Sequence, residues 1–190
     1  MDKGKNSCRR LAKHFDVEGH AHFLTFSCWK RQAFLSRDRT RTWFLENLQV
    51  ARRLFDLWAF VIMPEHVHLL LLPHEGATMG AILRALKQPV AQHASCWVRH
   101  HAPESLPLIQ DRQPSGRLMY RFWQPGPGYD RNMWSPKELR EKVDYIHANP
   151  IRRKLVDRPG DWLSSSYRAW ETGEDVPVAL DRESFPILVT

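Results

Sequence analysis

Two histidines separated by one apolar residue are the feature of this chain with the clearest chemical potential. His66 and His68 lie in the hydrophobic run MPEHVHLLLL, which starts at Met63. In a β-strand, residues two apart point to the same face, so both imidazoles would converge on one point while Val67 and Leu69 turn toward a core. Imidazole is a frequent metal ligand. The spacing therefore predicts a pair of metal ligands, and the alternative is that the imidazoles are satisfied by backbone or carboxylate partners.

The segment 135–150 has the signals of a helix. Ser135 is a typical helix cap, Pro136 suits the first helical position, and Glu138 would complete a capping box. Asn149-Pro150 would end this helix near position 148, because a residue that precedes proline disfavours helical geometry.

Tyr145 and Asn149 lie four residues apart on this predicted helix and share one flank. A phenol, with a pKa of about 10, becomes a competent nucleophile where a cation or base favours phenolate. A metal held by His66, His68 and the Asn149 carboxamide oxygen would also polarise a phosphate under attack. The structural alternative is a packed ring and a helix cap. Tyr129, in a glycine-rich turn, is a second candidate nucleophile, but no partner ligand accompanies it on a helix.

The elements that must position these residues follow the order β-α-β-β-α-β. Apolar periodicity and breaker residues predict strands at 20–29, 56–63, 66–72 and 118–124 and helices at 38–55 and 78–98, with Pro89 kinking or splitting the second helix. Pro64-Glu65 forms the turn between two strands, and 125–129 is a turn. This order predicts an α+β, ferredoxin-like antiparallel sheet with helices on one face. A C-terminal tyrosine-bearing helix and an extension follow, and the free face is open for a site.

Composition indicates one globular domain with a polyanionic partner. The 190 residues are 43% hydrophobic and carry a net charge of +7. Three widely spaced cysteines indicate neither a disulfide framework nor a cysteine zinc site, which favours the cytoplasm. No apolar run is long enough to span a membrane. We divide the chain into a basic arm (1–19), the domain (20–170) and an acidic tail (171–190), and expect a monomer rather than a dimer.

Cations and aromatic residues are interleaved in several segments, as expected where phosphates are neutralised and bases stacked. The predicted DNA contacts are Trp29, Lys30, Arg31, Arg84, Lys87, Arg121, Trp123, Gln124, Tyr129, Arg131, Arg152 and Arg153.

Two separated motifs resemble one family, the REP-associated tyrosine transposases, which are single-tyrosine HUH transposases. The first is MPEHVHLL around His66 and His68, and the second is YIHANP from Tyr145. The resemblance covers about 20–170 and implies a ferredoxin-like fold. It also implies an enzyme that cuts and rejoins single-stranded DNA beside REP-like hairpins. Tyr145 would form a covalent 5′-phosphotyrosine, and His66, His68 and Asn149 would bind Mg²⁺ or Mn²⁺.

The chain departs from the wider family at two positions. Asn149 stands where many relatives outside the REP-associated branch have Gln, so this ligand arm is shorter by one methylene. Glu65 stands where many members have Asn, and we interpret it as a turn residue rather than a partner of a metal ligand. Two other functions stay open: a non-catalytic nucleic-acid-binding protein on the same fold, and a metal-dependent phosphodiesterase that activates water.

Overall fold

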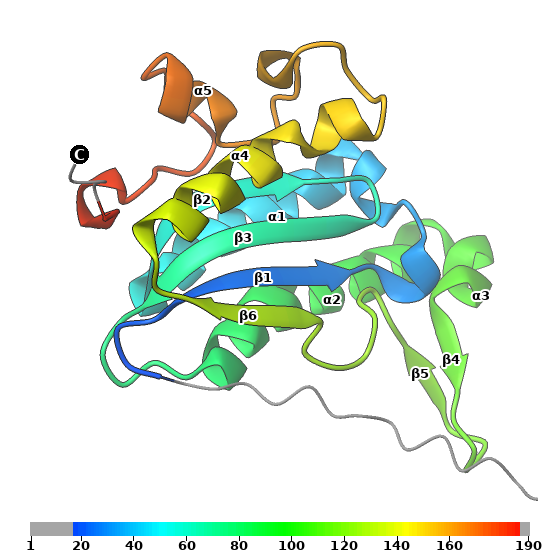
Figure 1. Cartoon of the computed structure of the whole chain (residues 1–190). Helices are drawn as coiled ribbons and strands as arrows, with labels where there is room; N and C mark the ends of the chain where they lie inside the picture. The colour runs from blue at the N-terminus through cyan, green and yellow to red at the C-terminus, as the bar shows by residue number, and fades with distance from the viewer. Residues whose placement is uncertain (1–16, 187–190) are drawn as a thin grey trace, which may run out of the picture.

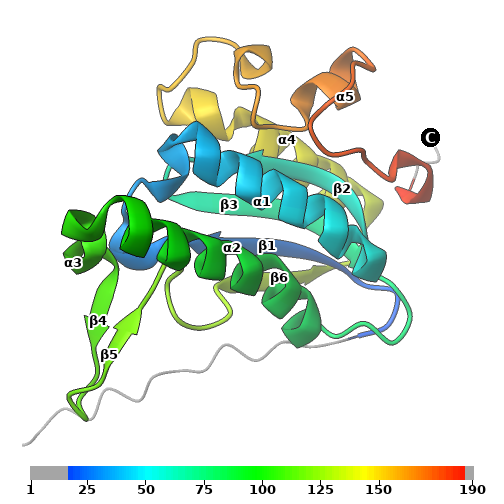
Figure 2. The ribbon, with the colours of Figure 1, turned by 180° about the vertical axis from the view of Figure 1, so that it is seen from behind.

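The computed structural model describes residues 17–186, which form an antiparallel sheet with helices on both faces (Figure 1). The strand order is β2-β3-β1-β6, with β1 at Ala21–Ser27, β2 at Phe55–Ile62, β3 at His66–Pro73 and β6 at Tyr129–Met133. Helices α1 (Asp38–Ala51) and α2 (Met79–His101) cover one face, as Figure 2 shows, and α4 (Pro136–Arg152) covers the other. The predicted α+β class is confirmed, and α4 occupies the face that the sequence left for a site.

Shorter elements surround the sheet. They are α3 (Leu106–Ile109), the β4–β5 ribbon (Gln110–Arg112 and Leu118–Tyr120), α5 (Tyr167–Glu171), and 3₁₀ turns at Trp29–Arg31, Phe34–Ser36, Arg52–Leu54, Pro103–Ser105, Pro159–Asp161 and Arg182–Ser184. No helix among residues 17–186 is long and apolar enough to cross a membrane.

Alternate residues of the central strands face two separate cores. Val67, Leu69 and Leu71 of β3 pack with α1 and α2, whereas Leu70 packs in the core beneath α4. Since residues two apart share a face, His66 and His68 point the same way as Leu70. The strand therefore presents both imidazoles to α4.

The fourth strand of the sheet is not the predicted one. Segment 118–124 was expected to fill that place, but Leu118–Tyr120 pairs with Gln110–Arg112 in a separate ribbon, and Tyr129–Met133 pairs with β1. Tyr129–Met133 is polar because it lies at the sheet edge, where only Met133 is buried. Gly128 permits the approach to β1: its φ is +86°, and a Cβ there would lie 2.2 Å from the Thr25 carbonyl oxygen.

Helix α2 runs through Pro89 without being split. A proline inside a helix lacks the N–H that would bond the carbonyl four residues earlier. Here the side chain of Asn47 on α1 replaces it, because its Nδ2 donates to the carbonyls of Ala85 and Leu86 at 2.8 and 2.9 Å. Of the two expected effects of Pro89, a kink or a split, the split does not occur, because a neighbouring helix supplies the missing donor.

Helix α4 differs from its prediction at both ends. Ser135 is the N-cap residue, but its side chain makes no capping bond, and Glu138 forms an ion pair with Arg131 at 2.8 Å instead of closing a capping box. At the other end the helix continues past Pro150 to Arg152. Asn149 therefore lies within the last helical turn rather than beyond it.

Residues 172–186 pack along the β2 side of the sheet. The Asp181 carboxylate accepts a hydrogen bond from the backbone of Leu57 at 2.8 Å and pairs with Arg52. Trp58 donates its indole N–H to Ser184 at 2.9 Å, and Val178 is buried in the core. Most of the predicted basic arm lies outside the described residues, and the domain boundaries stay predictions.

Candidate active site

The two histidines of β3 face each other. His66 Nε2 and His68 Nε2 are 3.0 Å apart, and both residues are at most 6% exposed. Strand geometry explains the convergence. The two histidines are two residues apart on β3, so both side chains point to the face that α4 covers. The predicted convergence of the two imidazoles is therefore present in the fold.

Each imidazole is anchored through its other nitrogen. His66 Nδ1 lies 3.0 Å from a carboxylate oxygen of Glu65, and His68 Nδ1 lies 2.7 Å from the hydroxyl of Thr25. A carboxylate only accepts, so His66 Nδ1 donates to Glu65, and the neutral ring then has its lone pair on Nε2. The Thr25 hydroxyl can accept from His68 Nδ1 or donate to it, so this bond allows either tautomer of His68. In the tautomer with its proton on Nδ1, His68 would also direct an Nε2 lone pair toward His66.

Burial keeps both rings neutral. It lowers the pKa of His68 to about 3, the neighbouring His66 adds to the shift, and hydrogen bonding to Asn149 opposes it. Burial also lowers the pKa of His66, against the opposing effect of Glu65. A neutral imidazole is the form that binds a metal, so the site is ready to bind a cation at neutral pH.

Tyr145 and Asn149 approach the histidines from α4. The Tyr145 ring lies edge-on to His68, with centroids 5.7 Å apart, and to Phe23 at 5.8 Å. Asn149 Nδ2 donates to the Tyr145 carbonyl at 2.9 Å, so its carboxamide oxygen is not used in that bond. Lys142 lies one turn before Tyr145, with its Nζ 4.8 Å from the ring centroid. The four residues predicted as the site thus gather at one place.

Glu65 is not the solvated turn residue that the sequence suggested. It is 8% exposed, and besides His66 its carboxylate pairs with Arg153 at 3.0 Å and Arg31 at 3.6 Å. Glu65 does lie in the turn between β2 and β3, but the expectation that it is solvated was wrong, because arginines distant in sequence surround it. Glu65 therefore connects a candidate metal ligand to two cations.

A cavity of about 420 Å³ joins these groups. It is lined by Thr25, Ser27, Arg31, His66, His68, Tyr145, Asn149, Arg152 and Arg153. Within residues 17–186, no group of three or more His, Cys, Asp and Glu side chains is placed to hold a metal. The Asn149 carboxamide, the predicted third ligand, lines this cavity with the two histidines.

The comparisons with known proteins agree with the motifs. No family model matches the chain. A protein of Escherichia coli (strain K12) named "REP-associated tyrosine transposase" is 24% identical over 157 residues, which are 82% of this chain and 81% of that protein. The chain resembles the REP-associated tyrosine transposases. A Haemophilus influenzae relative with the same family name is 26% identical over 144 residues, 69% of this chain and 74% of its own.

A solved structure has the same fold. It is described as a REP-associated tyrosine transposase bound to a REP hairpin, and it matches with a TM-score of 0.63 at 20% identity, covering 94% of this chain and 98% of its own. The resemblance to REP-associated tyrosine transposases that the sequence predicted is confirmed, and with it the similarity to a family of enzymes.

The predicted DNA contacts that lie nearest the site of this transposase-like chain are arginines. Arg31, Arg152 and Arg153 are exposed and line the same cavity as Tyr145, and the Arg152 guanidinium carbon lies 5.2 Å from the Tyr145 ring. Tyr129 is 54% exposed and packs edge-on against Phe23, at 6.0 Å.

Other predicted contacts have structural roles. Trp29 and Trp123 are buried, and the Trp123 indole donates to the Lys87 carbonyl at 2.9 Å. Arg121 pairs with Asp111. The remaining predicted contacts do not line this cavity. They are exposed or half-buried on the protein surface: Lys30, Arg84, Lys87, Gln124 and Arg131.

Sequence reasoning missed two residues of the site, Thr25 and Lys142. Thr25 pairs with His68 across β1 and β3, which only the strand register reveals. Lys142 precedes Tyr145 by three residues, the spacing of neighbours on one helix face.

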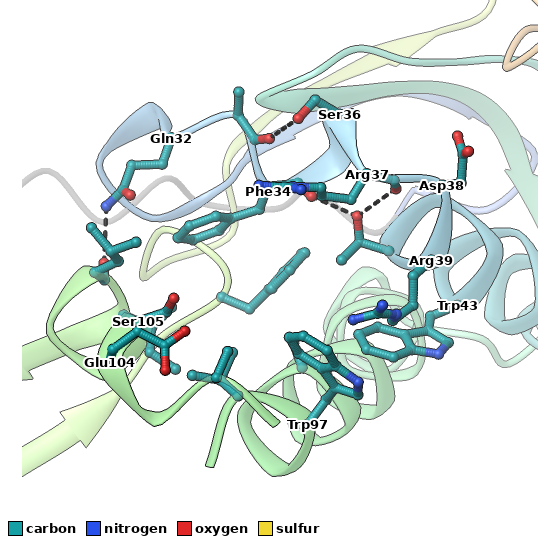
Figure 3. A pocket seen from close by; sticks show the side chains of 18 residues that line it. Gln32, Phe34, Ser36, Arg37, Asp38, Arg39, Trp43, Trp97, Glu104 and Ser105 are labelled. Atoms are coloured by element: carbon teal, nitrogen blue, oxygen red, sulfur yellow. Dashed lines mark hydrogen bonds between the residues drawn. The ribbon is translucent and has the colours of Figure 1, made fainter. Parts of the chain in front are cut away.

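A larger cavity, of about 670 Å³, lies between the start of α1, the C-terminal part of α2 and α3 (Figure 3). Trp43, Trp97 and Phe34 line it, and the Arg39 guanidinium carbon lies 3.8 Å from the Trp97 ring centroid. None of the four predicted site residues lines it. The candidate active site is therefore not in the larger of these two cavities.

Proposed function

We propose that this chain is a metal-dependent single-stranded DNA endonuclease and strand transferase that acts next to DNA hairpins through a covalent 5′-phosphotyrosine. The observation that carries the proposal is the convergence of His66 Nε2 and His68 Nε2, 3.0 Å apart, in the cavity that Tyr145 and Asn149 also line. The names of the relatives and the hairpin in the similar solved structure support the same substrate class.

The spacing of the two nitrogens fits a shared metal ion. A separation of 3.0 Å is within the range for two nitrogens that bind one ion. His66, His68 and the Asn149 carboxamide oxygen would hold the ion, which would polarise a phosphate oxygen when bound.

Tyr145 is the proposed nucleophile. Its phenolic oxygen attacks the phosphorus, a tyrosine–phosphate bond forms, and the bond from phosphorus to the 3′ oxygen breaks. The phenol loses its proton, and the departing 3′ oxygen gains one and leaves as a hydroxyl group. The free 3′-hydroxyl can later attack the phosphotyrosine, which restores the phenol and joins strands.

The other residues of the cavity bind and orient. Arg31, Arg152 and Arg153 line it and provide positive charge for the scissile phosphate and its neighbours. Lys142 and Arg152 lie 4.8 and 5.2 Å from the centroid of the Tyr145 ring, so both cations flank the proposed nucleophile. Glu65 accepts from His66 Nδ1, which leaves the Nε2 lone pair of that ring for an ion, and Thr25 anchors His68 through its Nδ1.

The test is covalent capture. Purified protein is incubated with Mn²⁺ or Mg²⁺ and labelled single-stranded hairpins from the DNA flanking its gene, and denaturing gels are searched for protein–DNA adducts. Tyr145→Phe should abolish the adduct while hairpin binding is kept. Tyr129→Phe is the matched control, and it should leave the adduct in place.

Each alternative function predicts a different result. Cleavage without an adduct in the wild-type protein would indicate a phosphodiesterase that activates water. Binding with neither cleavage nor adduct would indicate a non-catalytic DNA-binding protein. An adduct that persists in Tyr145→Phe but disappears in Tyr129→Phe would move the nucleophile to Tyr129.

A further inference from the structure

A groove follows one side of helix α2, on the opposite face of the sheet from the histidines. Two cavities form it, of about 430 and 530 Å³, and they share Gln88, Ala91 and Tyr120 as lining residues. The first lies between α2 and the segment 120–127, and the second between α2 and the β4–β5 ribbon. Figure 2 shows this ribbon projecting beside the C-terminal part of α2. The shared residues make the two cavities one continuous groove.

The groove is lined by cations and contains no carboxylate. Its basic lining residues are Arg84, Lys87, Arg99, His100, Arg117 and Arg121. Helix α2 has no Asp or Glu anywhere in its 23 residues. Elsewhere on the described surface, cations are often balanced by a neighbouring acid, as Arg131 is by Glu138. A wall of one charge sign attracts a polyanion.

Three of these cations are available to a ligand. Within residues 17–186, Arg84, Arg99 and Arg117 form no ion pair, and all three are exposed. Two others build the groove instead. Lys87 donates to the carbonyls of Gln124 and Gly126, at 3.2 and 2.8 Å, while Arg121 pairs with Asp111.

We propose that this groove binds the sugar–phosphate backbone of a duplex DNA stem. Arg84 and Arg99 are separated by 15 positions on α2, which at the rise of a helix is about 22 Å. One strand of B-DNA presents a phosphate about every 3.4 Å along the axis, so the span matches roughly six base pairs. A short hairpin stem has this length. The inference rests on the proposed function, since it names where the hairpin part of that substrate would dock.

The chemistry of the lining favours duplex over single-stranded DNA. Sites for single strands offer open aromatic faces on which bases stack. In the groove, Phe122 and Trp123 are buried, and Tyr120 has the Arg99 guanidinium over its ring, 4.6 Å from the centroid. Cations and the amides of Gln88 and Gln92 remain, and these suit phosphate oxygens.

A strip of contacts connects the groove to the candidate active site. Lys87 bonds the Gln124 carbonyl, and the Gln124 side chain accepts a hydrogen bond from the backbone of Lys30 at 3.1 Å. The next residue, Arg31, lines the cavity that contains Tyr145. A stem in the groove would therefore direct its single-stranded arm past Lys30 and Arg31 toward the nucleophile.

The test compares two DNA probes of equal length and charge. One is a hairpin with a stem of about eight base pairs, and the other is an unstructured strand. The double variant Arg99→Gln, Arg117→Gln removes two exposed charges and leaves the core intact. Its control is Arg53→Gln, Arg158→Gln, which removes two exposed charges elsewhere. Affinity is measured by fluorescence anisotropy over a range of NaCl concentrations.

The groove variant should bind the hairpin about tenfold more weakly at moderate salt. The slope of log K against log salt should fall by about 1.8, because each phosphate contact contributes about 0.9. Binding of the unstructured strand and the behaviour of the control should stay near wild type. Equal losses for both probes would overturn the duplex assignment in favour of single-stranded DNA, and no loss would remove the groove as a DNA site.

Failure of the groove and failure of the proposed function give different results. Anisotropy reports binding without chemistry, whereas adduct formation by wild-type protein reports the tyrosine reaction. If the wild-type protein forms no adduct but the groove variant binds the hairpin more weakly, the groove is supported and the tyrosine reaction is refuted. An adduct with unchanged hairpin affinity in the variant would do the reverse.

Discussion

Replacing Glu65 should weaken metal binding at the two histidines. Its carboxylate accepts from His66 Nδ1 at 3.0 Å, which orients the ring and places a negative charge behind it. Glu65→Gln keeps an acceptor and removes the charge. Glu65→Ala removes both, so it should have the larger effect. Partners of metal-ligating histidines typically contribute 10- to 100-fold in affinity.

The geometry gives a magnitude for the charge. An ion on His66 Nε2 would lie roughly 7 Å from the Glu65 carboxylate, across the ring. At an effective dielectric constant of about 20, one unit charge at that distance is worth about 2.4 kcal/mol per charge on the ion. Arg153 and Arg31 pair with the same carboxylate and offset part of this attraction. We therefore expect Mn²⁺ to bind about 10-fold more weakly in Glu65→Gln and up to 100-fold more weakly in Glu65→Ala.

Calorimetric titration of Mn²⁺ into the DNA-free protein measures this effect directly. Glu138→Gln is the matched control, because it also removes a carboxylate that pairs with an arginine, but at the surface with Arg131. Unchanged Mn²⁺ affinity in both Glu65 variants would refute the reasoning. Equal losses in the Glu65 and Glu138 variants would show that net charge, rather than orientation of His66, sets the affinity.

Two further predictions concern the folded state. Asn47→Ala should lower the free energy of unfolding by about 1–3 kcal/mol in a denaturant titration, because the carbonyls of Ala85 and Leu86 lose their donor. Gln49→Ala, on the same helix, is the control. A loss in Asn47→Ala no larger than that in Gln49→Ala would contradict this reasoning. Burial lowers the pKa of His147 from 6.5 to about 4, so only the unfolded chain takes up this proton between those values, and stability should fall by up to about 3 kcal/mol as the pH drops through that window. His147→Gln should remove that part of the fall, and an unchanged pH profile would show that His147 is not its source.

Much of the sheet and the four central site residues could be predicted from the sequence because their signals are local. Alternation in β3 places His66 and His68 on one face whatever the rest of the chain does. Helical spacing likewise puts Tyr145 and Asn149 on one flank. The prediction of the fourth strand was wrong because its sequence carries no local signal. Tyr129–Met133 is an edge strand with one buried residue, so it lacks the apolar run by which a strand is recognised.

Two features that sequence reasoning missed depend on contacts between distant segments. Glu65 follows a proline at a turn, which locally indicates solvent, and only the approach of Arg153 from α4 makes it a buried partner of His66. Pro89 locally predicts a break, and only Asn47, on another helix, supplies the missing donor. In both cases one polar side chain satisfies groups that would otherwise be buried without partners. Such a bond produces no periodic pattern in a single sequence. The tertiary structure is therefore needed to distinguish a residue that contacts a candidate metal ligand from an ordinary turn residue.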